Sequence, residues 1–280
     1  MKRERTNQRR ATERGFTLTE VMVAITLSVF LLMGLFSILQ QTRRTNGNTT
    51  GLSQLQDDER VAMTIMTDTI ETAGYVPEAN GSGQSNFIAA APFTTAGQII
   101  TGSTTGASVG EVLTMRYDLA ANDTTLQCDG TRNTGAEAAF TETFEITTNA
   151  AGVNQLVCIP NSGATVPLVN NVANLTFQFS VNSTSAGSIT PSNKTGPNSE
   201  GSSVTGLGCP GDSWVATGSM STSDWTNVCA VKVDILFINP LYQPAGQAQP
   251  TPGQNQYITF ERVITILSKT GVNVTSSTTT

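Results

Sequence analysis

Hydrophobic and polar positions divide the chain into regions with different periodicities. Residues 21–39 form an unbroken apolar run without a charge or a proline. As a helix rising 1.5 Å per residue, this run would extend about 28 Å, close to the hydrocarbon thickness of a bilayer. The run therefore predicts a transmembrane helix, and Arg43 and Arg44 follow it directly.

The helical pattern continues beyond the apolar run as a stripe on an otherwise polar sequence. Apolar residues recur at spacings near three and four, at Leu52, Leu55, Ala62, Ile65, Met66 and Ile70. Gly74 suits the position after a helix C-terminus, and Pro77 follows it. We therefore expect a long helix over 16–74. Asn46-Gly47-Asn48 interrupts the pattern, and we expect it to bend or locally unwind the helix.

After Pro77 the periodicity changes to two, which is typical of strands with one buried and one wet face. The alternating segments are 113–117, 144–146, 175–181 and 231–235. Residues 257–267 combine alternation with a continuous apolar end and predict a more central strand. The fold class expected is α+β, with the helix stripe covering an antiparallel sheet in a head over 75–280. A Ser/Thr/Gly-rich insertion occupies about 182–229 of this head.

Composition and charge exclude several classes of function. The chain has 280 residues and no histidine, which removes Ser-His-Asp and Cys-His catalysis and every His metal ligand. No phosphate-binding loop or clustered metal ligands occur, so we expect no enzyme activity, no cofactor and no metal. Residues 1–15 carry six cations and two carboxylates, and the rest carries 9 Lys and Arg against 19 Asp and Glu. This acidic remainder argues against direct nucleic-acid binding.

The N-terminal region differs from a secretory signal peptide. The apolar run is longer than the usual ~7–15 residues, and no A-x-A cleavage site follows it. A plain membrane anchor explains the run better. Such an anchor leaves Glu20, a carboxylate at the start of the apolar stretch, without an explanation.

The segment Arg14-Gly15-Phe16-Thr17-Leu18-Thr19-Glu20, followed by the apolar helix, resembles the leader of type IV pilins and type II secretion pseudopilins. The resemblance implies that prepilin peptidase removes leader 1–15 by cutting between Gly15 and Phe16, and then methylates Phe16. The helix would stay in the inner membrane with the head periplasmic. It would later enter an extracellular pilus among the major pilin and other minor pilins.

Weaker matches point to the PilW-like minor pilins, a structural group without enzymatic activity. The segments concerned are 64–77, 168–181, 229–238 and 260–269. Membership would imply a part in priming pilus assembly, and so in motility, adhesion or DNA uptake. Two alternatives stay open: a type II secretion pseudopilin, and a pilus-tip adhesin that uses the insertion over 182–229.

All four cysteines, Cys128, Cys158, Cys209 and Cys229, follow the anchor, where an extracytoplasmic, oxidising location favours disulfides. The gaps of 30, 51 and 20 residues do not fit a Cys₄ zinc site, and no C-x-x-C motif is present. Of the three possible connectivities, sequential pairing closes the smallest loops. We expect the bridges Cys128–Cys158 and Cys209–Cys229.

Two further features have a functional and a structural interpretation. Glu20 would cost free energy inside an apolar layer, so we expect it to pair with the α-amino group of a neighbouring subunit and to set the register between helices. The alternative is an interfacial carboxylate that tolerates replacement. For Trp214 and Trp225 we favour a small core in a disulfide-closed loop over an exposed binding site.

Overall fold

The structure is a computed structural model. It describes residues 16–77, 87–104, 109–161, 163–181, 213–242 and 255–270. By their internal contacts, the residues form two compact units, 1–51 and 52–280.

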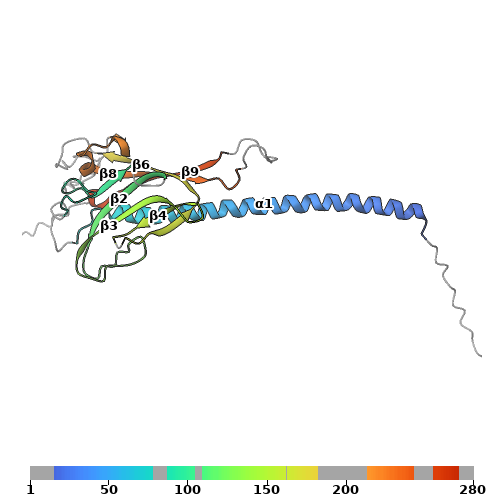
Figure 1. Cartoon of the computed structure of the whole chain (residues 1–280), viewed down its shortest axis with the longest axis horizontal. Helices are drawn as coiled ribbons and strands as arrows, with labels where there is room; N and C mark the ends of the chain where they lie inside the picture. The colour runs from blue at the N-terminus through green and yellow to red at the C-terminus, as the bar shows by residue number, and fades with distance from the viewer. Residues whose placement is uncertain are drawn as a thin grey trace, which may run out of the picture. The chain divides into compact units, whose positions relative to one another are not determined.

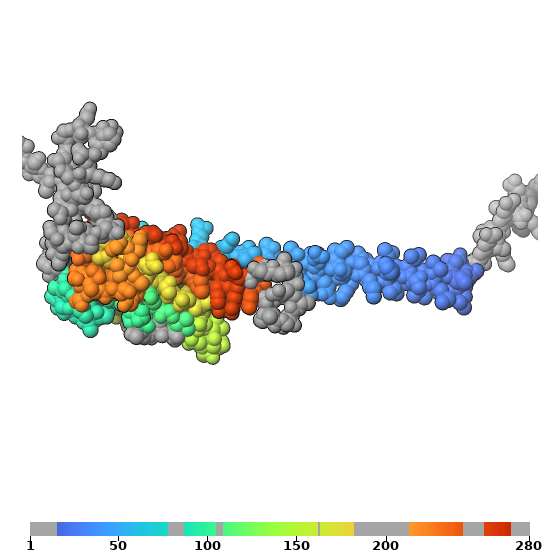
Figure 2. All heavy atoms as spheres, turned by 90° about the horizontal axis from the view of Figure 1, so that it is seen from above, coloured from blue at the N-terminus to red at the C-terminus, as the bar shows by residue number. Residues whose placement is uncertain are grey.

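Helix α1 (Leu18–Thr72) begins in the first unit and continues into the second without interruption. In the first unit, residues 16–50 are all exposed, and their side chains form a rod one helix thick (Figure 2). The expected break at 46–48 does not occur. The helical hydrogen bonding continues there, and Thr45 and Thr49 reinforce it by donating to the carbonyls four residues earlier, at 3.0 and 2.9 Å.

The second part of α1 buries the predicted stripe. Its buried residues are Leu55, Ala62, Met63, Met66, Thr69 and Ile70. The helix ends as expected, because Gly74 has a φ of +75°, the left-handed conformation that glycine adopts without strain. The Gly74 N–H donates to the Arg116 carbonyl at 2.9 Å, and the Tyr75 carbonyl accepts from the Asp118 N–H at 2.8 Å. The segment that follows the helix is thus hydrogen-bonded to the strand that contains Arg116 and Asp118.

That strand belongs to a five-stranded antiparallel sheet whose strands follow one another in sequence order. Figure 1 labels three of them, β2, β3 and β4. The strands are β1 (Ile100–Ser103), β2 (Val109–Leu119), β3 (Ala138–Thr148), β4 (Asn154–Ile159) and β5 (Val166–Asn170). Each strand of this sheet therefore pairs with the strand that precedes or follows it in the sequence. In the β3–β4 pair, Phe144 lies opposite Cys158.

A second, four-stranded antiparallel sheet has the order β7-β6-β8-β9. Its strands are β6 (Val172–Val181), β7 (Ser213–Ala216), β8 (Val228–Ile238) and β9 (Tyr257–Thr265). Short 3₁₀ turns, η2 (Thr217–Ser219) and η3 (Asp224–Asn227), precede β8, and helix α2 (Leu267–Thr270) follows β9. Part of the predicted insertion, β7, is therefore a strand of this sheet, and residues 182–212 lie outside the described residues.

The expectation of a central strand over 257–267 is wrong. In the described part of the chain, β9 pairs with β8 alone and lies at the edge of its sheet. Its residues Tyr257, Thr259 and Val263 are exposed, because one face of the strand is directed away from the core. The continuous apolar end contains Ile264 and Ile266, which are buried, so hydrophobicity there reflects burial of one strand end rather than a central position.

The second unit has one hydrophobic core, to which α1 and both sheets contribute. The α1 stripe shares this core with inward-facing residues such as Leu113 and Phe144 of the first sheet and Phe177 and Val233 of the second. A polar contact also joins the sheets, because the Glu111 carboxylate accepts the backbone N–H of Phe177 at 2.7 Å. The fold is α+β, as the two periodicities predict.

Candidate functional site

The start of α1 is built around a reciprocal pair of hydrogen bonds between Thr17 and Glu20. The Glu20 carboxylate accepts the Thr17 N–H at 3.0 Å, and Thr17 Oγ1 accepts the Glu20 N–H at 3.4 Å. The Thr17 hydroxyl also donates to the carboxylate at 3.0 Å. This is a capping box, which satisfies two backbone donors that an uncapped helix leaves without partners. It explains why the helix begins here.

The capping box is a structural role for Glu20 that the sequence analysis missed. The signal was present, since Thr17 and Glu20 have the T-x-x-E spacing directly before an apolar run. The box holds the carboxylate at the helix terminus in an isolated chain. It therefore gives Glu20 a partner before any neighbouring subunit is present.

The residues beside the capping box place an apolar side chain next to the carboxylate. Phe16 is 86% exposed, and Gly15 lies outside the described residues, so cleavage between them stays a prediction. A shallow hollow on the helix surface is lined by Phe16, Glu20, Val21, Ala24, Ile25, Ser28 and Val29. Glu20 thus lies at the polar end of an apolar surface.

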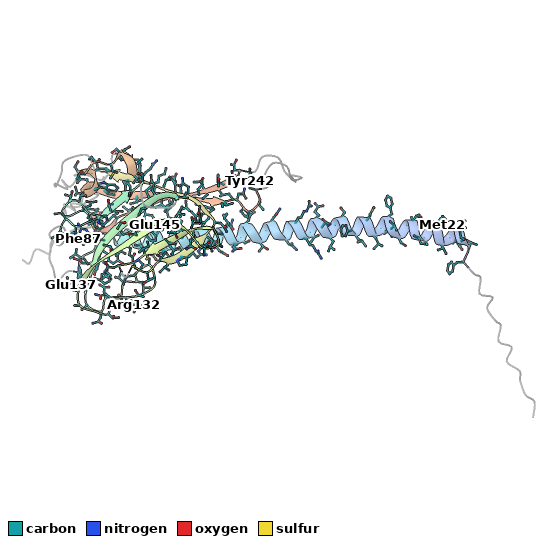
Figure 3. All side chains as sticks on the ribbon, in the orientation of Figure 1. Met22, Phe87, Arg132, Glu137, Glu145 and Tyr242 are labelled. Atoms are coloured by element: carbon teal, nitrogen blue, oxygen red, sulfur yellow. A yellow bond between two sulfur atoms is a disulfide. The ribbon has the colours of Figure 1, made fainter. Side chains whose placement is uncertain are left out.

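Among the described residues, α1 is one helix long and apolar enough to cross a membrane. Its apolar side chains are exposed in the first unit; Met22, which is labelled in Figure 3, is 61% exposed. Burying one such side chain fully is worth roughly 1.5–3 kcal/mol. A helix with this surface requires lipid or other apolar helices around it, and the arrangement fits membrane anchoring before assembly.

The expected disulfide between Cys128 and Cys158 is present, with the two Cα atoms 6.4 Å apart. It ties the loop between β2 and β3 to β4. Cys229 is buried and is not a free thiol, but Cys209 lies outside the described residues. The bridge Cys209–Cys229 therefore stays a prediction.

A buried carboxylate lies beside the disulfide. Glu142 of β3 is 1% exposed, and its Oε1 accepts the Cys128 N–H at 2.8 Å and the Tyr117 hydroxyl at 2.9 Å. Burial raises the pKa of Glu142, and these hydrogen bonds oppose that effect. The sequence analysis missed this residue, although Glu142 shares its strand face with Phe144 and Ile146, an unusual place for a carboxylate.

Arg116 is a buried cation whose contacts stabilise the fold. Arg116 of β2 is 5% exposed, and its guanidinium stacks on the rings of Phe87 and Phe93, at 5.1 and 4.3 Å from their centroids. Its Nε donates to the Gln98 carbonyl at 2.6 Å and its Nη1 to the Ile88 carbonyl at 2.7 Å. Arg116 thus fastens the segment before β1, where Phe87 is labelled in Figure 3, onto the sheet.

The two tryptophans have different environments. Trp225 is buried and contacts Phe179 edge to face, with ring centroids 4.8 Å apart, as expected for a small core. Trp214 is 48% exposed on strand β7, so the prediction of a core position is wrong for this residue. The difference arises because Trp214 lies opposite Ser180 on the polar side of β6, which alternates with the core-facing Phe179.

Comparison with known proteins gives one match. The family model described as the prokaryotic N-terminal methylation motif matches residues 10–36, which include Gly15, Phe16 and Glu20. No curated protein and no solved structure matches the chain. The motif is the cleavage site of type IV prepilin peptidase, and it points to a structural protein rather than an enzyme. Together with the α+β fold, it supports a place for this chain in the type IV pilin-like family of prepilins.

Proposed function

We propose that this protein is a minor pilin of a type IV pilus, similar to the PilW-like proteins, and that it takes part in priming pilus assembly. The observation that carries the proposal is the methylation motif at residues 10–36, joined to a helix whose side chains over 16–50 are all exposed. Such a helix is suited first to the inner membrane and then to a bundle of pilin helices. The major pilin and other minor pilins are the partners of this second state.

In this proposal, prepilin peptidase cuts before Phe16 and leaves a free α-amino group on it. The head is periplasmic until assembly, and extracellular afterwards. Glu20 then changes partner, from the Thr17 backbone in the isolated chain to the α-amino group of an adjacent subunit. At about 4 Å and an effective dielectric near 20, that attraction is worth about 4 kcal/mol before desolvation.

The capping box makes this role testable with three variants. Glu20→Gln removes the charge but keeps a side chain that can complete a capping box. Thr17→Ala removes the hydrogen bond that Thr17 Oγ1 accepts but keeps the charge, and Glu20→Ala removes the charge together with the bond that the carboxylate accepts from the Thr17 N–H. If the charge drives assembly, the two Glu20 variants are absent from sheared filaments, and Thr17→Ala is present at parental abundance.

Two measurements precede this comparison. Intact-mass analysis should show the loss of residues 1–15 and the gain of one methyl group, and membrane levels of all variants should match the parent. A mature N-terminus beyond residue 39 would contradict the pilin proposal. Normal incorporation of Glu20→Gln would show instead that the carboxylate serves the cap alone.

Deletion strains and sheared filaments distinguish the minor pilin from the type II secretion pseudopilin and the tip adhesin. A type II secretion pseudopilin would be required for export of secreted enzymes, and pili would form without it. A tip adhesin would leave piliation intact when residues 182–212 are deleted, but attachment to surfaces would be lost. A minor pilin that primes assembly predicts fewer pili when the whole protein is absent.

A further inference from the structure

A shallow hollow on the first part of α1 lies where the apolar run ends. Six exposed residues line it, and they recur every three or four positions on one face of the helix: Met33, Phe36, Ser37, Gln40, Gln41 and Arg44. Along this face the chemistry changes in a fixed order, from apolar side chains through a hydroxyl and two amides to a guanidinium. These six residues are called the graded face below.

The polar side chains of the graded face have no partner in the described part of the chain. Other hydroxyls on this part of α1 bond to the helix itself; Ser28, for example, donates to the Ala24 carbonyl at 2.7 Å. Among the described residues, the side chains of Ser37 and Arg44 form no hydrogen bond and no ion pair, and the same holds for the two amides. These donors are therefore available to a ligand.

The neighbouring face of the helix lacks this gradient. Arg43 lies one residue from Arg44 and thus about 100° around the helix axis. Four and seven residues before Arg44 lie Gln40 and Ser37, whereas the same places before Arg43 are apolar. Arg43 has the same charge at the same level of the helix, but it lacks these polar neighbours.

We propose that the graded face binds one anionic glycerophospholipid, with phosphatidylglycerol as the model, while α1 is in the membrane. Such a lipid has the matching order of groups: an acyl chain for the apolar residues, ester carbonyls that accept from the hydroxyl and the amides, and a phosphate for Arg44. Guanidinium and phosphate form bidentate, charge-assisted hydrogen bonds. From Met33 to Arg44 the helix rises about 17 Å, close to the ~20 Å of one leaflet with its headgroups.

The local charge identifies the ligand as anionic. Residues 40–51 carry two arginines and no carboxylate, so an anion at this level of the helix gains attraction without repulsion from nearby acids. A zwitterionic lipid also offers a phosphate, but its ammonium group is repelled by the same arginines. The inference rests on the membrane anchoring in the proposed function, because the lipid is within reach only while α1 crosses a bilayer.

The test is native mass spectrometry of the full chain in detergent, titrated with phosphatidylglycerol and phosphatidylcholine that have the same acyl chains. We expect one phosphatidylglycerol per chain, bound in preference to phosphatidylcholine. Arg44→Gln should lower this preference about fivefold, as expected for one cation near an anionic headgroup. Arg43→Gln removes the same charge and should leave most of the preference in place. The cations of residues 1–15 are identical in all variants, so their attraction for lipid cancels in the comparison.

A second pair of variants tests the hydrogen-bonding part of the graded face. Ser37→Ala removes a hydroxyl that has no partner in the described chain, and it should weaken phosphatidylglycerol binding about two- to tenfold. Ser28→Ala is the matched control, because its hydroxyl is already bonded within the helix, and it should bind as the parent does. Glycerol 3-phosphate, which has the phosphate without the acyl chains, should not displace the lipid.

Three results would overturn the lipid site: equal losses in Arg44→Gln and Arg43→Gln, which would indicate surface charge alone; equal binding by Ser37→Ala and the parent; and displacement by glycerol 3-phosphate, which would indicate a site for free phosphate. Insertion into vesicles of the two lipids separates this inference from the proposed function. A chain that inserts but shows no preference overturns the lipid site alone, whereas a chain that does not insert overturns the anchoring as well.

Discussion

The two parts of helix α1 share one backbone geometry but have opposite surroundings. Residues 16–50 are exposed on every side, whereas the part after Leu52 buries a stripe that includes Met66 and Ile70. The more apolar part of the helix is the exposed one, which is the reverse of the usual relation between hydrophobicity and burial. The first part is therefore built for an apolar environment outside the chain, and the second for a core within it.

This contrast separates two kinds of stability. In the second part, side-chain packing contributes to the folding of the head. In the first part, the side chains over 16–50 are all exposed, so the stability of the helix in the isolated chain rests on backbone hydrogen bonds, the capping box at Thr17 and the surrounding solvent or lipid. Substitutions of one kind should then have different consequences in the two parts.

The largest difference is expected for a matched pair of methionines. Met66 is fully buried, and Met66→Ala should lower the free energy of unfolding of the head by about 2–5 kcal/mol. Met33 is 71% exposed, and Met33→Ala should change it by less than about 0.5 kcal/mol. Urea unfolding in detergent, followed by the fluorescence of the buried Trp225, measures both. Equal losses of unfolding free energy in the two variants would contradict this difference between the two parts of the helix.

A smaller effect is expected at the cap. Thr17→Ala removes the side-chain partner of the Glu20 N–H and should destabilise the first turn by about 1 kcal/mol. Hydrogen exchange of the amides after Thr17 should accelerate about fivefold, while amides around Met66 keep their parental rates. Acceleration in both places would mean that the two parts unfold together.

At 46–48 the first part contains residues with low helix propensity, and their side chains are exposed. Gly47 has open space around its Cα, so Gly47→Ala fits and should stabilise the local helix by roughly 0.5–1 kcal/mol. Amides near Asn46 and Asn48 should exchange about two- to fivefold more slowly. Unchanged exchange there would show that something other than propensity controls local opening.

The smallest effect concerns Asp58, at the start of the second part. Partial burial, followed by the nearby charge of Asp57, raises the pKa of Asp58 above its ordinary 3.8. The folded state then holds this proton more tightly than the unfolded state, so the free energy of unfolding falls as the pH rises from about 3.8 through the folded pKa.

Asp58→Asn removes that dependence. The variant should gain a little stability relative to the parent above this pH window and none below it. Urea unfolding of both proteins at several pH values measures the difference. Two parallel pH profiles would contradict the raised pKa.

Periodicity in the sequence was sufficient for the fold class, for helix α1 and for strands β2, β3, β6, β8 and β9, but it did not predict β1, β4, β5 or β7. The apolar stripe, the end of the helix at Gly74 and the alternating strands follow from local rules about which faces are buried. The methylation motif likewise depends on residues adjacent in sequence, and the match over 10–36 supports it. The pairing Cys128–Cys158 followed from loop length and is confirmed.

Tertiary structure decided the features that depend on contacts between distant residues. The edge position of β9, the exposure of Trp214 and the burial of Arg116 depend on which strands become neighbours, and periodicity carries no information on strand order. Glu142 is the clearest case, because its partners Tyr117 and Cys128 lie 25 and 14 residues away. The sequence determined which faces are apolar, since that is a local property. Only the fold could bring a carboxylate and a disulfide together, since proximity between strands is set by the sheet that they form.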